Sequence, residues 1–71
     1  MKLNCAALRK LLDEGWRITA ATDEMEARNA SVLGVTLERE GQRLIRQIDR
    51  EGWALAMTEL HGLDHMVDFL V

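Results

Sequence analysis

The sequence feature that most constrains the fold is an approximate internal duplication. Residues 8–18 align with residues 45–55, and the two segments share Arg, Glu, Gly and Trp as well as three apolar positions. Both tryptophans of the chain, Trp16 and Trp53, follow a Glu-Gly pair in this alignment. A repeat this short usually marks one supersecondary unit used twice, because a single copy cannot bury its own apolar face. The alignment predicts two halves of similar structure.

A length of 71 residues predicts a single domain over 1–71, with repeat 1 at 3–38 and repeat 2 at 40–71. A domain of about 60 residues buries only about 60% of the surface that its unfolded chain exposes, so its stability is marginal. The single cysteine excludes an internal disulfide that would add stability. We therefore expect a homo-oligomer, most simply a dimer, because packing against a second copy buries further surface.

In repeat 1 the pattern predicts a helix over about 4–14 and a strand over 16–21. Asn4 is a suitable N-cap for the helix, and Gly15 suits the left-handed conformation that commonly follows a helix. The strand alternates apolar and polar residues, with Trp16 directed inward. The first half thus begins with a helix followed by a strand.

The polar segment 23–31 leaves two interpretations open. Asp23 and Glu26 could form a capping box, which would begin a helical turn. We favour a mobile hairpin loop that leads into a second alternating strand over 32–38.

In repeat 2 the duplication predicts a second helix over about 42–51, ended by Gly52, and a third strand from Trp53 to Met57. Residues 63–71 have both strand-like alternation and helical spacing of apolar residues, and the repeat favours the strand. The resulting fold class is α+β, a duplicated αββ unit in the order α-β-β-α-β-β. Its four strands form a mostly antiparallel sheet with two helices on one face.

Each half also resembles a known pattern. A helix ending in Glu-Gly-Trp, an alternating strand, a variable loop and a strand ending in charge are similar to a family of small bacterial domains of unknown function. The pattern of that family reads roughly Leu-Asn-x-Leu-x-x-Glu-Gly-Trp-Glu-Leu-Val. The resemblance covers residues 8–38 and, more loosely, 45–71, and the chain lacks the leading strand of the family. It implies the fold of each half and supplies no catalytic residue.

Residue types that catalyse reactions or bind metals are few and scattered. His61 and His65 have the i, i+4 spacing that zinc sites on helices use, but Gly62 lies between them and no Glu follows His61. We interpret these weak metal candidates as solvated histidines near a turn. Cys5 is far in sequence from both histidines, and the five glycines are isolated, so neither a cysteine nucleophile nor a phosphate-binding loop is indicated. The sequence predicts no enzyme and no cofactor.

Four arginines are the leading candidates for binding a partner. On the predicted second helix, their 4-3-4 spacing places them within about 60° of one another. The first repeat lacks this stripe, so the fold does not require it. The stripe is either a solvated face or a docking surface for an acidic partner or nucleic acid. The four residues are Arg39, Arg43, Arg46 and Arg50.

A second candidate surface is the predicted outer face of the sheet. Its residues are small and only mildly polar, which suits the close approach of another sheet or helix. The alternative is an open, solvated sheet face. The residues expected in an oligomer interface are Arg17, Thr19, Ala21, Ala54, Ala56 and Thr58.

The leading functional hypothesis is a small non-enzymatic protein-interaction module. Inhibition of a partner protein is one form of that role, since the size and acidic balance are similar in general character to small phage-encoded inhibitors such as anti-CRISPR proteins. The alternative is a nucleic-acid-binding regulator that uses the arginine stripe, which a net charge of −3 disfavours. A metal- or ligand-binding accessory of an enzyme ranks third.

The sequence also bears on where the protein acts. No apolar run approaches the about 20 residues that span a bilayer, and the first residues lack the pattern of a secretory signal. We expect a cytoplasmic protein that binds a protein partner and no membrane.

Overall fold

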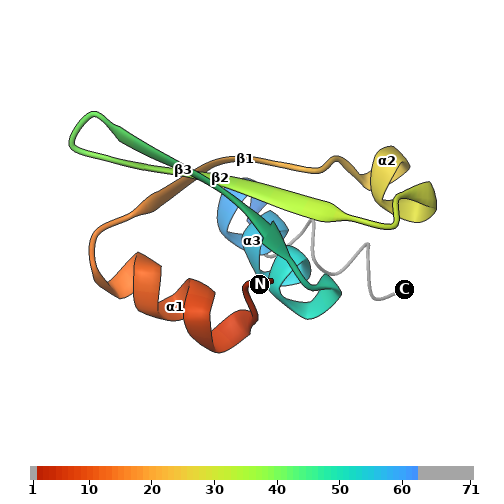
Figure 1. Cartoon of the computed structure of the whole chain (residues 1–71), viewed down its shortest axis with the longest axis horizontal. Helices are drawn as coiled ribbons and strands as arrows, with labels where there is room; N and C mark the ends of the chain where they lie inside the picture. The colour runs from red at the N-terminus through yellow and green to blue at the C-terminus, as the bar shows by residue number, and fades with distance from the viewer. Residues whose placement is uncertain (1, 63–71) are drawn as a thin grey trace.

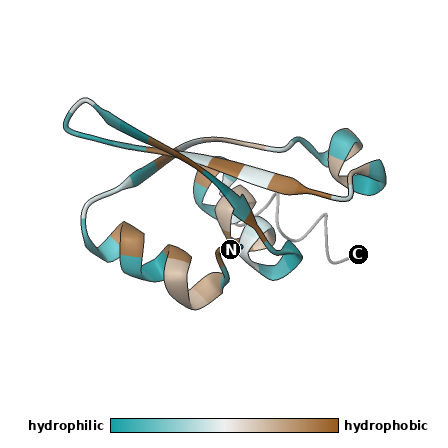
Figure 2. Cartoon of the chain, in the orientation of Figure 1, coloured by the Kyte–Doolittle hydropathy of each residue, from teal (hydrophilic) through white to brown (hydrophobic). Residues whose placement is uncertain are grey.

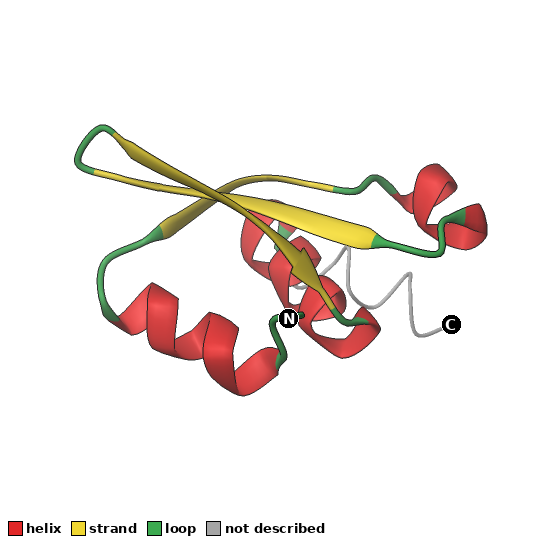
Figure 3. Ribbon diagram, viewed as in Figure 1, coloured by secondary structure: helices red, strands yellow, loops and turns green. Residues whose placement is uncertain are grey.

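The computed structural model describes residues 2–62 of the chain. Figures 1 and 3 show the arrangement of the helices and strands in this part of the sequence. The elements are α1 (Cys5–Asp13), β1 (Arg17–Ala21), α2 (Glu24–Asn29), β2 (Leu33–Arg39), β3 (Gln42–Ile48) and α3 (Arg50–His61). The fold is α+β, but the prediction of a duplicated αββ unit with a four-stranded sheet is wrong, because these residues form a three-stranded sheet and three helices. The strand predicted at 63–71 lies outside the described residues.

The three strands form one antiparallel sheet in the order β1-β2-β3, so β2 lies in the middle. β2 and β3 pair along their full length, from Leu33 opposite Ile48 to Arg39 opposite Gln42. β1 pairs with β2 through an irregularity just after Ile18. β1 and β3 are therefore the two edge strands of the sheet.

A two-residue turn joins β2 to β3, close to where a helix is predicted to begin. Glu40 and Gly41 have φ angles of 49° and 80°. Positive φ at both central residues is the conformation of a type I′ turn, whose twist matches that of the flanking strands. Gly41 adopts this conformation without strain. The helix predicted over 42–51 is therefore wrong, since the tight turn returns the chain along β2 as β3.

The two Glu-Gly-Trp segments lie at opposite ends of helices. Gly15 follows α1 with a φ of 96°, and the chain leaves the helix there to enter β1. In the second segment, the Gly52 N–H donates a hydrogen bond of 2.7 Å to the Asp49 side chain, which caps the start of α3. Trp53 consequently lies in a helix, and the strand predicted from Trp53 to Met57 is wrong. The duplication is one of sequence and not of structure.

The favoured hairpin loop over 23–31 is also wrong, and the alternative helical turn is correct. The Glu26 N–H donates a hydrogen bond of 2.8 Å to the Asp23 side chain, and α2 begins directly after Asp23. Ala27 on this short helix is buried in the core. The cap fixes the start of α2, and the buried Ala27 packs this helix against the core.

The core lies between the sheet and two helices, α1 and α3, on the same side of the sheet (Figure 1). Alternate residues of β2 from Leu33 to Leu37 are buried, as predicted, and Figure 2 shows the hydrophobic segments of this strand. The Trp53 indole N–H donates a hydrogen bond of 2.7 Å to the Thr22 carbonyl, so its polar group is paired. The buried core residues are Leu8, Trp16, Ala27, Leu33, Val35, Leu37, Ile48, Trp53, Ala56 and Met57.

The residues predicted to form an oligomer face come from two different elements. Arg17, Thr19 and Ala21 lie in β1. The other three lie on α3, where Ala56 is completely buried. Because these three residues belong to a helix beneath the sheet, their predicted place on the outer face of the sheet is wrong. The expected homo-oligomer stays a prediction. The six residues are Arg17, Thr19, Ala21, Ala54, Ala56 and Thr58.

Candidate partner-binding edge of the sheet

The four arginines predicted to form one stripe lie on three different elements. Arg39 ends β2, Arg43 and Arg46 lie in β3, and Arg50 begins α3. Successive side chains of a strand point to opposite faces, so Arg43 and Arg46, three residues apart, lie on opposite faces of the sheet. The helical stripe is therefore wrong, and each arginine has its own environment.

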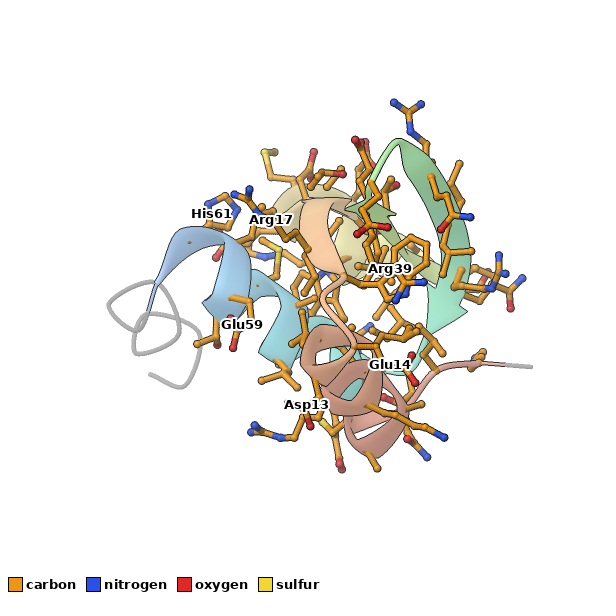
Figure 4. The ribbon with its side chains drawn as sticks, turned by 90° about the vertical axis from the view of Figure 1, so that its left-hand side faces the viewer. Asp13, Glu14, Arg17, Arg39, Glu59 and His61 are labelled. Atoms are coloured by element: carbon orange, nitrogen blue, oxygen red, sulfur yellow. The ribbon has the colours of Figure 1, made fainter. Side chains whose placement is uncertain are left out.

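Arg39 stabilises the junction between α1 and the sheet. Its guanidinium lies 4.5 Å from the centroid of the Trp16 ring, and its Nη1 donates a hydrogen bond of 2.8 Å to the Glu14 carbonyl. Figure 4 shows Arg39 beside Glu14, where α1 gives way to the strands. A cation over an aromatic ring and a cation bound to the C-terminal carbonyl of a helix both stabilise a fold. Arg39 is thus engaged within the protein.

Arg50 connects α3 to α2 in a similar way. Its Nη2 donates a hydrogen bond of 3.2 Å to the carbonyl of Ala27, near the C-terminal end of α2. The last carbonyls of a helix attract cations, so this contact supports the position of the short helix. Among the four candidate arginines, those of β3 make no such long-range contact to another helix.

β3 has an outer edge whose backbone groups do not pair with β2. Gln42 pairs with Arg39 beside the two-residue turn, so its N–H and C=O face β2. In an antiparallel ladder this orientation alternates from residue to residue. The backbone groups of Arg43 and Ile45 consequently point away from β2, toward the outer edge of the sheet.

The N-terminal segment occupies one end of this edge. The Leu3 N–H donates a hydrogen bond of 2.8 Å to the Gln47 carbonyl, and the Leu3 carbonyl accepts one of 2.9 Å from the Asp49 N–H. The segment runs parallel to β3 at this bridge, so one residue already adds to the sheet here. Within residues 2–62, no backbone hydrogen bond reaches the outer edge at Arg43 or Ile45. That part of the edge is open.

The open face of β3 carries one large apolar side chain between polar ones. Arg43, Ile45 and Gln47 alternate with inward-facing residues and are all exposed. The exposed fraction of Ile45 is 66%. Arg43 Nε lies 3.5 Å from the Glu38 carboxylate, but both side chains face solvent, and such exposed pairs contribute only about 0–1 kcal/mol. Arg43 can exchange this partner at little cost.

A hollow of about 360 Å³ lies between α1 and β3. Most of its lining is apolar, and its charged residues are two cations and one acid. Leu44 and Arg46 reach it from the helix-covered face of β3, the same strand that has the open backbone edge. The lining residues are Leu3, Ala7, Lys10, Leu11, Glu14, Leu44 and Arg46.

Of the two weak metal candidates, only His61 lies within the described residues. Within residues 2–62, no three His, Cys, Asp or Glu side chains lie close enough to hold one metal ion. His61 ends α3, away from Arg39 in Figure 4, and His65 lies outside the described residues. Cys5 is a free thiol in the first turn of α1.

Comparisons with protein-family models, with curated proteins and with solved structures found no match to the chain. The resemblance of each half to a small bacterial family stays a prediction. In the part of the chain that the structure describes, no helix is both long and apolar enough to cross a membrane.

Sequence reasoning missed two contributors to this edge, Ile45 and Lys10, and assigned Arg43 and Arg46 to a helix. A detectable signal was present. Residues 33–39 and 42–48 flank a two-residue Glu-Gly segment, and two strand-like runs joined by two residues that include Gly indicate a hairpin.

Proposed function

We propose that this protein is a non-enzymatic protein-interaction module that binds an extended segment of a partner as an added strand along β3. Recognition by strand addition takes affinity from main-chain hydrogen bonds and specificity from pockets for alternate side chains. The observation that carries the proposal is the open backbone edge of β3 at Arg43 and Ile45, next to the position where Leu3 already pairs.

The side chains around the edge support the same role. Charged residues on an edge strand can simply prevent aggregation, and Arg43 and Arg46 would serve that purpose. Prevention of aggregation does not explain Ile45. This large apolar side chain is 66% exposed at the centre of the edge, where it attracts other strands. The neighbouring hollow offers an apolar pocket for one face of an added strand.

The alternative of a nucleic-acid-binding regulator depended on four arginines along one helix face. Arg39 and Arg50 are engaged in contacts within the protein, and Arg43 and Arg46 point to opposite faces of the sheet. No continuous basic stripe remains to follow a phosphate backbone. We therefore prefer a protein partner, and inhibition of that partner by sequestering its segment stays a prediction.

The proposal can be tested by selecting binders from a displayed library of random linear peptides on the intact protein and mapping them by NMR. We expect the bound peptides to shift the amide signals of Arg43 and Ile45. Ile45→Pro removes an outward N–H without removing a hydrogen bond to β2, so it should abolish binding. The matched Ile45→Thr variant keeps that N–H and a high strand propensity and should retain binding.

Circular dichroism and tryptophan fluorescence establish that both variants are folded. Peptides that shift signals on another surface would contradict strand addition at β3. So would peptides that bind folded Ile45→Pro as tightly as the natural chain.

A further inference from the structure

We infer that the segment bound at β3 is acidic and carries apolar side chains at alternate positions, which face the hollow between α1 and β3. This inference rests on the proposed strand addition and specifies the chemistry of the partner.

The strand β3 itself carries two positive charges, although the chain as a whole carries a net charge of −3. β3 contains Arg43 and Arg46 and no acidic residue, and Lys10 lines the hollow from α1. Glu14 is the one acid in that lining, and Glu38 is the acid nearest to Arg43. A strand added here would place the carboxylates between its apolar residues on the open face beside Arg43, and Arg46 and Lys10 on the covered face add to the positive charge near the edge.

The alternation of a strand sets where the apolar residues of the partner must lie. Side chains of an added strand point alternately to the two faces of the sheet. Those on the helix-covered face would come beside Leu44 at the hollow, whose apolar lining also includes Leu3 and Leu11. Burying apolar side chains there is favourable by about 25 cal/mol for each Å² removed from water. The opposite side chains remain near Arg43 and solvent.

The hydrogen-bonding groups of the edge can pair with the backbone of an added strand. The Arg46 Nη1 donates a hydrogen bond of 2.9 Å to the Ile45 carbonyl, so that acceptor already has a donor. The N–H groups of Arg43 and Ile45 and the Arg43 carbonyl also point outward. The arginines beside these groups interact best with carboxylate oxygens of the partner.

Two synthetic peptides test the inference on the full-length chain. The first is Ac-Glu-Leu-Glu-Val-Glu-Leu-Glu-NH2, and the second has Lys in place of every Glu, with the same apolar pattern. We expect the Glu peptide to bind at least about tenfold more tightly at low ionic strength, with shifts at Arg43 and Ile45 in NMR spectra. The difference should shrink as salt is added, because these charges are near solvent.

Charge variants locate the source of this preference. Arg43→Glu combined with Arg46→Glu should reverse it, so that the Lys peptide becomes the tighter ligand. Arg9→Glu, the same change on an exposed position of α1 outside the hollow lining, should leave the preference within about twofold. An unchanged preference in the double variant would overturn the inference.

Further outcomes separate this inference from the proposed function. If both peptides bind the natural chain equally and neither binds folded Ile45→Pro, the inference of an acidic partner is wrong. Strand addition at β3 would still be supported. If the Glu peptide still binds folded Ile45→Pro, its binding depends on charge attraction and not on strand addition. That result would overturn both the inference and the proposed function. The absence of shifts in β3 with either peptide would also overturn both.

Discussion

Gly52 occupies a position in which a single added methyl group should destabilise the protein. In an exposed helix interior, replacing glycine with alanine usually stabilises by about 1 kcal/mol. At Gly52, however, an added Cβ would lie 2.7 Å from Ile48 Cγ1, 3.0 Å from Ile48 Cδ1 and 3.1 Å from Asp49 Oδ1. Ile48 is only 1% exposed, and a close-packed interior leaves it little room to move.

Two losses of stability and one gain determine how much Gly52→Ala changes the free energy of unfolding. Overpacking a core position costs about 1–3 kcal/mol, and disturbing an N-cap side chain costs about 0.5–2 kcal/mol. The gain in helix propensity offsets about 1 kcal/mol of this loss. We expect Gly52→Ala to reduce the free energy of unfolding by about 0.5–4 kcal/mol, which lowers Tm by at least about 2 °C in a domain of this size. Urea and thermal unfolding, followed by circular dichroism, measure both quantities.

A second substitution identifies the crowded contact. Ile48→Val removes Cδ1 and alone should cost about 0.5–1.5 kcal/mol. In that background Gly52→Ala should cost less than in the natural chain, because the contact at 3.0 Å with Cδ1 is removed while the contact at 2.7 Å with Cγ1 remains. Stability that rises with Gly52→Ala, or a cost that is the same in both backgrounds, would refute the steric reasoning.

Three other substitutions test separate parts of the fold by urea unfolding. Glu40→Asn should stabilise the protein by about 0.5–1 kcal/mol, because Asn tolerates positive φ and is preferred in type I′ turns; a loss of stability would contradict this turn. Asp49→Ala should cost about 0.5–2 kcal/mol through loss of the α3 cap, whereas Asp13→Ala, which removes an exposed aspartate from the last position of α1, should stay within about 0.5 kcal/mol. Equal effects of these two changes would contradict the capping role of Asp49. Arg39→Met should cost about 1–2 kcal/mol, since it removes the contact with Trp16 and the bond to a helix carbonyl, and an unchanged stability would show that Arg39 is not engaged.

The first half of the fold, apart from α2, could be predicted because local signals and packing agree there. Asn4 caps α1 through a hydrogen bond of 2.8 Å from the Ala7 N–H, and Gly15 ends the helix region at positive φ. The alternation of β2 marks one face for the core. Each of these features requires only neighbours in sequence, so the pattern alone suffices.

The second half could not be predicted from apolar spacing, because two periods fit the same residues. Leu44 and Ile48 are four residues apart, and that spacing places side chains on one face of a helix and also on one face of a strand. Ile45 favours the helical interpretation, yet it is exposed on the open face of β3. The duplication then assigned Asp49 to a helix interior, although it acts as the cap of α3. The two-residue turn at 40–41 was the signal that separates the alternatives.

The residues of the candidate site are harder to predict than the helices and strands, because they depend more on tertiary contacts. The sequence singles out four arginines, but which of them faces solvent is decided by contacts between distant residues. Arg39 meets Trp16 only after α1 and β2 pack together. The open edge of β3 depends on the order of strands in the sheet and on where Leu3 pairs, and neither can be read from spacing in the sequence.

Amide hydrogen exchange along β3, measured with and without the Glu peptide, tests strand addition most directly. In the free protein the N–H groups of Leu44 and Arg46 should be protected by pairing with β2, whereas those of Arg43 and Ile45 should exchange rapidly. Saturating peptide should slow exchange at Arg43 and Ile45 while leaving Leu44 and Arg46 protected as before. Rapid exchange at Arg43 and Ile45 in the presence of bound peptide would contradict the proposed function.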